Sequence, residues 1–221
     1  MGIECNYTTT SGAKYPLDFF FFNGMSNQLV YQPDVVREWC RIGCSNYGIG
    51  GGCPPRAPLY ETIVQSNKEI FLFACKFDSI YKPQSVANSN NIAIHWKFQD
   101  GILARAMNNL GHLITEKYGG RFLATGYCMG CPGKKCSFKL GEAVCRNPIR
   151  RTYSMEATGI NVVETVKRNF DINMYWYKKG KTDVPYMLKV ILWIPPDIQT
   201  NCLITDQITN LISGIKSIEL R

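Results

Sequence analysis

Residues 128–145 read CMGCPGKKCSFKLGEAVC, a segment with four cysteines in eighteen residues at the spacing C-x2-C-x4-C-x8-C. Gly130, Gly133 and Gly141 lie between the thiols. This composition predicts a loop folded around a bound group, rather than a helix or strand packed into a core. Thiolate sulfur is a soft ligand that selects zinc, copper(I) or iron–sulfur clusters. We therefore expect residues 128–148 to form a metal-binding loop.

The spacing of these cysteines bears on which metal they bind. Zinc sites with four cysteines usually combine two C-x2-C pairs separated by a dozen or more residues. Only Cys128 and Cys131 form such a pair, whereas Cys136 and Cys145 stand singly. The pattern favours a loop around a bulkier [4Fe-4S] cluster with these four cysteines as ligands, and zinc is the alternative.

A second cysteine-rich segment covers residues 40–55 and has the pattern Cys40-x3-Cys44-x8-Cys53, followed by two prolines. Five glycines lie between its thiols, at positions 43, 48, 50, 51 and 52. Glycine lets backbone amides approach and point at thiolate or sulfide. We expect a second cluster here, bound by three cysteines.

The sequence does not identify a fourth protein ligand for that cluster. Side chains that could supply it are Cys5, Cys75, Cys202 and His95, and the two loops could also exchange a ligand. Alternatively the fourth iron is open to a small anion or a substrate. On their own patterns, Cys5 is expected to be a bystander near the chain end, Cys75 a small hydrophobe in a buried strand, and Cys202 a core or surface thiol.

Length and composition predict a folded protein. The chain has 221 residues, 45% of them hydrophobic and 12% aromatic, which suits a single domain spanning residues 1–221. No stretch is apolar for long enough to span a bilayer, and no signal peptide is evident, so we expect a cytoplasmic protein. In a reducing compartment, ten cysteines favour metal ligation over disulfides.

The formal net charge of +8 raises the question of an acidic partner. The basic residues crowd the 128–148 loop, as Lys134, Lys135, Lys139, Arg146, Arg150 and Arg151. The formal count omits the negative charge of metal-bound thiolates in this loop. Part of the excess positive charge therefore balances the negative charge of the metal site. Nucleic acid is therefore not the expected partner.

The remaining pattern predicts an α/β fold, with a small mixed sheet flanked by helices and carrying the two cysteine-rich loops. Apolar runs predict strands at 69–77, 122–126 and 186–194. Helices are predicted at 35–40 with Asp34 as N-cap, at 58–66, at 100–118, from Asn161 to 169, and at 206–213. Residues 1–30 show no clear periodic element. His112 falls opposite the apolar stripe of its helix, so a solvated position is expected.

These motifs together resemble a known family: cysteine-rich, predicted metal-binding proteins of unknown function from anaerobic archaea and bacteria. The matching elements are Cys40-x3-Cys44 with Tyr47-Gly48, Cys53-Pro54-Pro55, Cys128-x2-Cys131-x4-Cys136, Cys145-Arg146-x-Pro148 and Ser154-Met-Glu156-Ala-x-Gly159-Ile. The resemblance implies metal ligation by these seven cysteines and an anaerobic setting. It implies no particular reaction.

Three functions follow from these residues. The favoured one is an iron–sulfur protein with two [4Fe-4S]-type clusters that transfers electrons to a larger redox partner. The second is an enzyme in which the cluster at Cys40, Cys44 and Cys53 has an open iron for sulfur transfer or reductive chemistry, with Tyr47, Arg56 or His95 handling protons or anions. The third is a zinc-stabilised binding module with a basic face.

Overall fold

The structure is a computed structural model organised around one sheet, and it describes residues 2–64, 68–131, 133–178, 180–196 and 205–220. Within these ranges the sheet has six strands in the spatial order β4-β5-β3-β2-β1-β6. The strands are β1 (Gly2–Thr8), β2 (Lys14–Met25), β3 (Glu69–Asp78), β4 (Arg121–Leu123), β5 (Tyr186–Ile194) and β6 (Ile218–Leu220). Neighbouring strands pair antiparallel, and an isolated parallel bridge joins Ala124 to Ser154. The predicted α/β class is confirmed.

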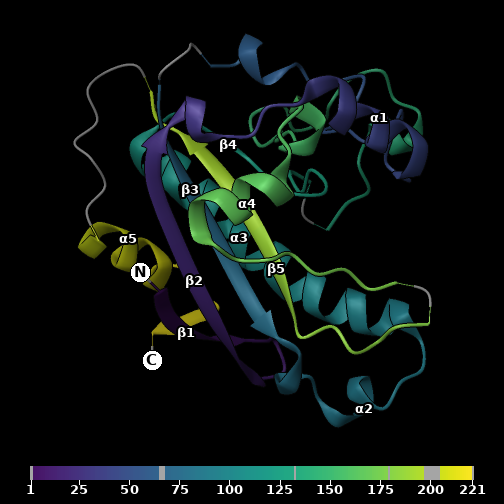
Figure 1. Ribbon diagram of the computed structural model, residues 1–221, viewed down its shortest axis with the longest axis vertical. Helices are drawn as coiled ribbons and strands as arrows, with labels where there is room; N and C mark the ends of the chain where they lie inside the picture. Colours follow the sequence, from purple (N-terminus) through teal and green to yellow (C-terminus); the bar gives the residue numbers. More distant parts are fainter. Residues whose placement is uncertain (1, 65–67, 132, 179, 197–204, 221) are drawn as a thin grey trace.

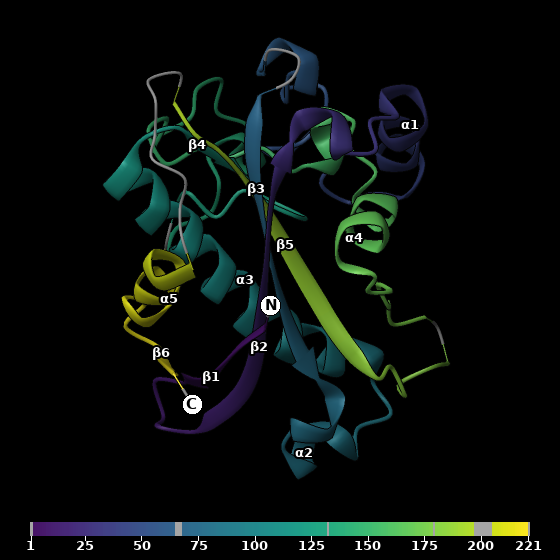
Figure 2. The same cartoon turned by 60° about the vertical axis from the view of Figure 1, so that its left-hand side comes forward.

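Helices cover both faces of this sheet (Figure 2). One face carries α3 (Ile92–Tyr118) and α5 (Thr205–Ser213), and the other carries α4 (Val162–Phe170). The described chain also forms α1 (Pro33–Gly43), α2 (Gln84–Ala87) and the 3-10 turns Ser26–Gln28, Tyr60–Thr62, Ser79–Tyr81, Phe138–Leu140 and Glu156–Thr158. None of the helices in the described ranges has the length and apolar character needed to cross a membrane.

The central strands β3 and β5 explain why the sheet needs two helical layers. Alternate side chains of a strand point to opposite faces, and both faces of these two strands are apolar. Phe71, Phe73 and Trp193 pack under α3, whereas Leu72 and Leu192 pack on the α4 side. The predicted strand at 186–194 matches β5 at both ends.

The N-terminal region differs from the prediction. Residues 1–30 contain β1 and the long strand β2, which pairs with β3. Cys5 is fully buried in β1, and its thiol donates a 3.6 Å hydrogen bond to the Leu17 carbonyl. The expectation of a thiol near a frayed end was therefore wrong, because β1 lies between β2 and β6 inside the sheet.

The helix predicted at 100–118 is real but longer, since α3 begins at Ile92, where the Asn91 side chain accepts a hydrogen bond from the Ala93 amide. Its predicted end is confirmed: Gly119, with φ of 75°, caps the helix. The expected solvation of His112 was wrong. Its side chain is buried, because β4 covers the helix there and the ring of Phe122 packs edge-on at 5.0 Å.

Other predicted helices hold with altered ends. α1 starts at Pro33 with Gln32 as N-cap, so Asp34 lies in the first turn and is not the cap. Asn161 caps α4 as predicted, accepting a hydrogen bond from the Glu164 amide at 3.2 Å. In place of the helix predicted at 58–66, the described residues form only a short 3-10 turn. The prediction for Cys202 lies outside the described residues.

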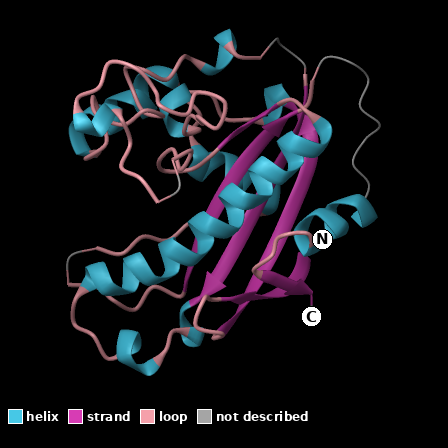
Figure 3. Ribbon diagram, turned by 180° about the vertical axis from the view of Figure 1, so that it is seen from behind, coloured by secondary structure: helices cyan, strands magenta, loops and turns pink. Residues whose placement is uncertain are grey.

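The segments that follow α1 and β4 lie side by side (Figures 1 and 3). The Ser154 amide donates to the Gly52 carbonyl at 3.0 Å, and Arg151 Nε donates to the Gly51 carbonyl at 2.8 Å. These bonds bring the two cysteine-rich loops to one region of the molecule, supported by the sheet.

Candidate metal centre

The four cysteines of the 128–148 loop line one cavity of about 460 Å³. They approach it from different points of an irregular loop, and Cys53 of the other loop lies in the same wall. Burial raises the pKa of Cys131, and the charges of Cys145, Cys128 and Cys136 raise it further. The four thiols are therefore close enough to act on one another electrostatically.

Backbone amides point at two of these sulfurs. The amides of Gly130 and Thr152 each lie 3.4 Å from Cys128 Sγ and donate to it. Burial acts to raise the pKa of Cys136, but hydrogen bonds from the backbone of Lys139, Gly51 and Phe138 outweigh it and bring this pKa below its usual value. Donors of this kind favour the thiolate, which is the form that binds metal.

The three cysteines of the first loop form a second group, which adjoins the first because Cys53 also lines the cavity described above. Cys40 lies in α1, Cys44 follows as the helix C-cap, and Cys53 lies beyond the glycine-rich turn. Burial raises the pKa of Cys40 to about 11, with added effects of Glu156 and Cys44. Burial also raises the pKa of Cys53 to about 12, with added effects of Cys44 and Cys40. The three thiols and Glu156 thus share one neighbourhood.

The glycines before Cys53 let the two loops touch. A Cβ on Gly52 would lie 2.4 Å from the Thr152 carbonyl oxygen and 3.0 Å from Cys128 Cβ. A Cβ on Gly51 would lie 2.9 Å from the ring of Phe138. The distances of 2.4 Å and 2.9 Å are too short for a side chain, so glycine at positions 51 and 52 allows the loops to approach each other.

Arginines clamp the same contact. The guanidinium of Arg56 lies 4.7 Å from the centre of the Phe138 ring, and that of Arg151 lies 5.2 Å from it. Arg56 also donates to the Gly48 carbonyl. Arg56, which was considered from the sequence as a residue that handles protons or anions, therefore connects the two loops. Tyr47, the second such candidate, donates a hydrogen bond from its backbone amide to the Cys44 carbonyl at 3.0 Å.

The other candidate ligands lie elsewhere. Cys75 is buried in β3, as its pattern predicts, and burial raises the pKa of its thiol, with smaller effects of the neighbouring Cys5 and Asp18. His95 Nδ1 lies 2.9 Å from Lys82 Nζ, and its Nε2 lies 2.7 Å from the Ser89 carbonyl. None of these side chains joins the Cys40, Cys44 and Cys53 group.

A second cavity, of about 660 Å³, opens beside Cys44, and the sequence analysis missed its polar residues. Lys189 Nζ and Asp100 Oδ1 form an ion pair of 3.0 Å there, with both side chains nearly buried. Burial raises the pKa of Glu156, which also lines this cavity. Its walls include Trp39, Trp96 and Trp176. The sequence did contain one indication of this polar site, because Lys189 lies inside the otherwise apolar strand at 186–194.

The donor set suits a thiolate-bound metal group, because four thiols line one cavity and amides donate to their sulfurs. The nine cysteines of the described ranges are free of disulfides. Within those ranges no three histidine, cysteine or acidic side chains are placed to hold a single metal ion.

No curated protein and no solved structure matches the chain. A protein family described as "Predicted metal-binding protein (DUF2284)" matches residues 25–192, a range that contains both cysteine groups. The chain therefore belongs to this family of predicted metal-binding proteins.

Proposed function

We propose that the protein binds two [4Fe-4S]-type clusters and transfers electrons to a larger redox partner. The observation that carries the proposal is the cavity shared by Cys128, Cys131, Cys136 and Cys145. Four thiolates complete the ligand set of a four-iron cluster, and such clusters supply one-electron chemistry when bound. Cys40, Cys44 and Cys53 would hold the second cluster.

The surroundings of the cavity support a redox role. Hydrogen bonds to ligand sulfur and nearby positive charge both stabilise the more negative, reduced state of a cluster. Here two amides donate to Cys128 Sγ. Basic side chains that line the cavity are Lys134, Lys135, Lys139 and Arg151.

The test is anaerobic purification of the full chain, followed by iron and sulfide assays, a visible spectrum and electron paramagnetic resonance of the reduced protein. We expect about eight iron and eight sulfide per chain, four of each for a cluster. A colourless protein with stoichiometric zinc would contradict the proposal and favour the zinc-stabilised module.

The cavity beside Cys44 favours a second candidate, an enzyme acting on a small molecule. Buried carboxylates with raised pKa values and buried charge pairs mark many catalytic clefts. Glu156 could donate a proton, and the Lys189–Asp100 pair could orient a polar substrate group between aromatic walls. This role fits the alternative in which the three-cysteine cluster has an open iron.

Cyanide separates the two candidates. Added to the reduced protein, it should change the paramagnetic resonance of a cluster with an open iron, while a fully ligated cluster should not respond. A spectrum that stays unchanged would leave electron transfer as the function, and a change that disappears in Cys53→Ser would assign the open site to the first loop.

A further inference from the structure

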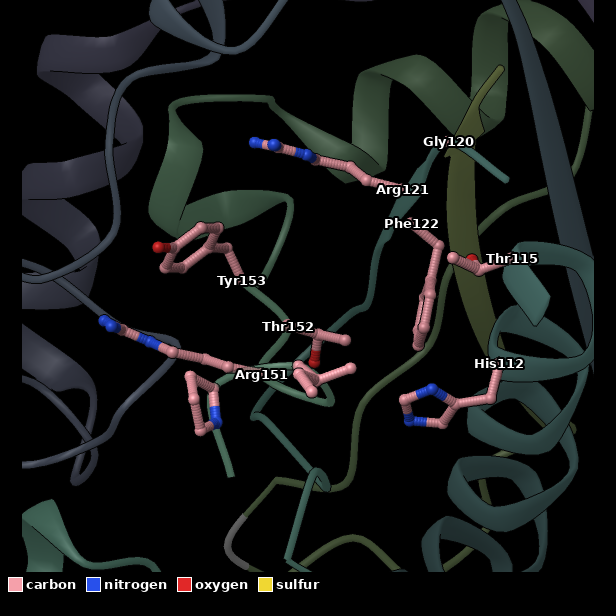
Figure 4. A pocket seen from close by; sticks show the side chains of 10 residues that line it. His112, Thr115, Gly120, Arg121, Phe122, Arg151, Thr152 and Tyr153 are labelled. Carbon is pink, nitrogen blue, oxygen red and sulfur yellow. The ribbon is translucent and has the colours of Figure 1, made fainter. Parts of the chain in front are cut away.

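A third cavity, of about 420 Å³, is lined by residues at the end of the 128–148 loop and directly after it. The end of α3, the start of β4 and residues 148–153 enclose it (Figure 4). Arg151 lines both this cavity and the cysteine cavity, and the Thr152 amide donates to Cys128 Sγ. None of the functions above uses it.

His112 supplies the first unused polar atom. The residue is only 8% exposed, and its buried Nε2 has no hydrogen-bond partner in the described chain. Figure 4 shows the imidazole reaching from α3 into the cavity beside Phe122. Burial and the nearby charge of Arg150 lower the pKa of His112 to about 4. The ring is therefore neutral at pH 7, and with its proton on Nε2 it donates one hydrogen bond.

Two further polar atoms beside His112 are also buried without a partner among the described residues. They are Thr152 Oγ1 and Arg150 Nε. Buried polar atoms in folded proteins nearly always have a partner, so the unpaired His112 Nε2 and Thr152 Oγ1 in one cavity wall indicate a missing hydrogen-bonding group. Thr115 on the same wall is different, because its hydroxyl donates to the Gly111 carbonyl at 2.7 Å.

Charge and shape define the ligand. Arg121 and Arg151 line the cavity, and Arg150 stands next to it, paired with Glu116 at 3.3 Å. The excess is positive, which favours an anion. Phe122, Pro148 and Ile149 supply an apolar part of the wall.

We propose that this cavity binds a small organic anion, whose oxyanion head accepts hydrogen bonds from His112 Nε2 and Thr152 Oγ1 and whose apolar body packs on Phe122. A carboxylate and a phosphate monoester share this chemistry. The site does not depend on which metal the cysteine loops bind, since its donors belong to α3 and to residues 150–152.

Calorimetric titration of the full, anaerobically purified chain tests the proposal with benzoate, phenyl phosphate, inorganic phosphate and benzyl alcohol. We expect saturable binding of benzoate or phenyl phosphate, and the tighter of the two identifies the head group. Benzyl alcohol binding as tightly would overturn the anionic head, and inorganic phosphate binding as tightly would overturn the apolar body. Binding of none of these probes would overturn the site.

Two matched variants locate the site. Thr152→Val keeps the side-chain shape and the amide that donates to Cys128, but removes the free hydroxyl, so affinity should fall about tenfold. Thr115→Val makes the same change on the same wall to a hydroxyl that is already bonded, so affinity should stay unchanged. Equal affinities in the two variants would contradict the proposal.

Nitrogen-15 resonances of histidine give a readout that needs no substitution, since the chain has two histidines. The ligand should move the His112 signals and leave those of His95, whose ring nitrogens already face Lys82 and Ser89. Equal shifts of both, or no shift of His112, would overturn the site.

Discussion

Lys189 Nζ lies 3.0 Å from Asp100 Oδ1, joining the central strand β5 to α3 inside the protein. Lys189 also donates to the Thr125 carbonyl at 3.3 Å, directly before the cysteine loop. Removing one member of a buried pair leaves the other charge without compensation, which is far more costly than losing an exposed pair.

The first prediction concerns this pair. Asp100→Asn should lower the free energy of unfolding by about 3 kcal/mol, because Lys189 stays buried without its counter-charge. Chemical denaturation measures the loss. The control is Lys14→Met, which breaks an exposed pair with Glu219 and should cost under about 1 kcal/mol. Equal effects of both substitutions would contradict the assigned burial.

The second prediction concerns the contact between the loops. Gly52→Ala places a methyl group 2.4 Å from the Thr152 carbonyl oxygen, so the loops must separate, at a cost of roughly 2 kcal/mol. Metal content after anaerobic purification should fall as well. Gly43→Ala is the matched control, because nothing lies within 4 Å of its added methyl group. If both variants behave like the parent, the loops do not touch as described.

The third prediction concerns the cysteine groups. Cys145→Ser and Cys53→Ser should each remove about half of the iron, because they belong to different groups. Cys75→Ala, in the core of β3, should keep the full amount. Loss of all iron from either single variant would show one shared site in place of two.

The fourth prediction is a pH dependence from His112. Burial and Arg150 lower its pKa from 6.5 to about 4, with Glu116 opposing, so the unfolded chain binds the proton more readily than the folded protein. The contribution of neutral His112 to the free energy of unfolding is fully present above pH 6.5 and is lost as the pH falls towards 4. The amount is on the order of 2 kcal/mol after allowance for solvent screening.

Denaturation curves at pH 7.5 and pH 5 measure this effect. His112→Gln should lose less stability between these two pH values than the parent chain. If His112→Gln loses as much stability between pH 7.5 and pH 5 as the parent chain does, the His112 ring of the parent protein is hydrated and not buried.

Features set by local sequence were predictable. Tyr186–Ile194 is a nearly continuous apolar run, interrupted by Lys189, and a near-continuous apolar run is typical of strands buried on both faces. Asn161 caps α4 through its own side chain, so the signal lies within four residues. The division of the cysteines into two neighbourhoods also follows their order in the chain.

Features set by distant partners were not predictable. Asp18 interrupts the apolar pattern of β2, and it is tolerated because Lys76 of the neighbouring strand lies 3.0 Å away. His112 looked solvated on the helix alone, and only β4, which crosses that side, buries it. Glu156 was visible in a motif, but its place beside Cys40 depends on α1 packing against its turn.

The hydrogen bonds from Arg151 to Gly51 and from Ser154 to Gly52 bear on how the protein matures. They join segments about a hundred positions apart, so during synthesis the 40–55 loop cannot form these contacts until residues 151–154 have been made. A ribosome that has released only the first half of the chain exposes Cys40, Cys44 and Cys53 without their supporting wall. If the two loops bind clusters as proposed, delivery of the metal would follow the synthesis of residue 154.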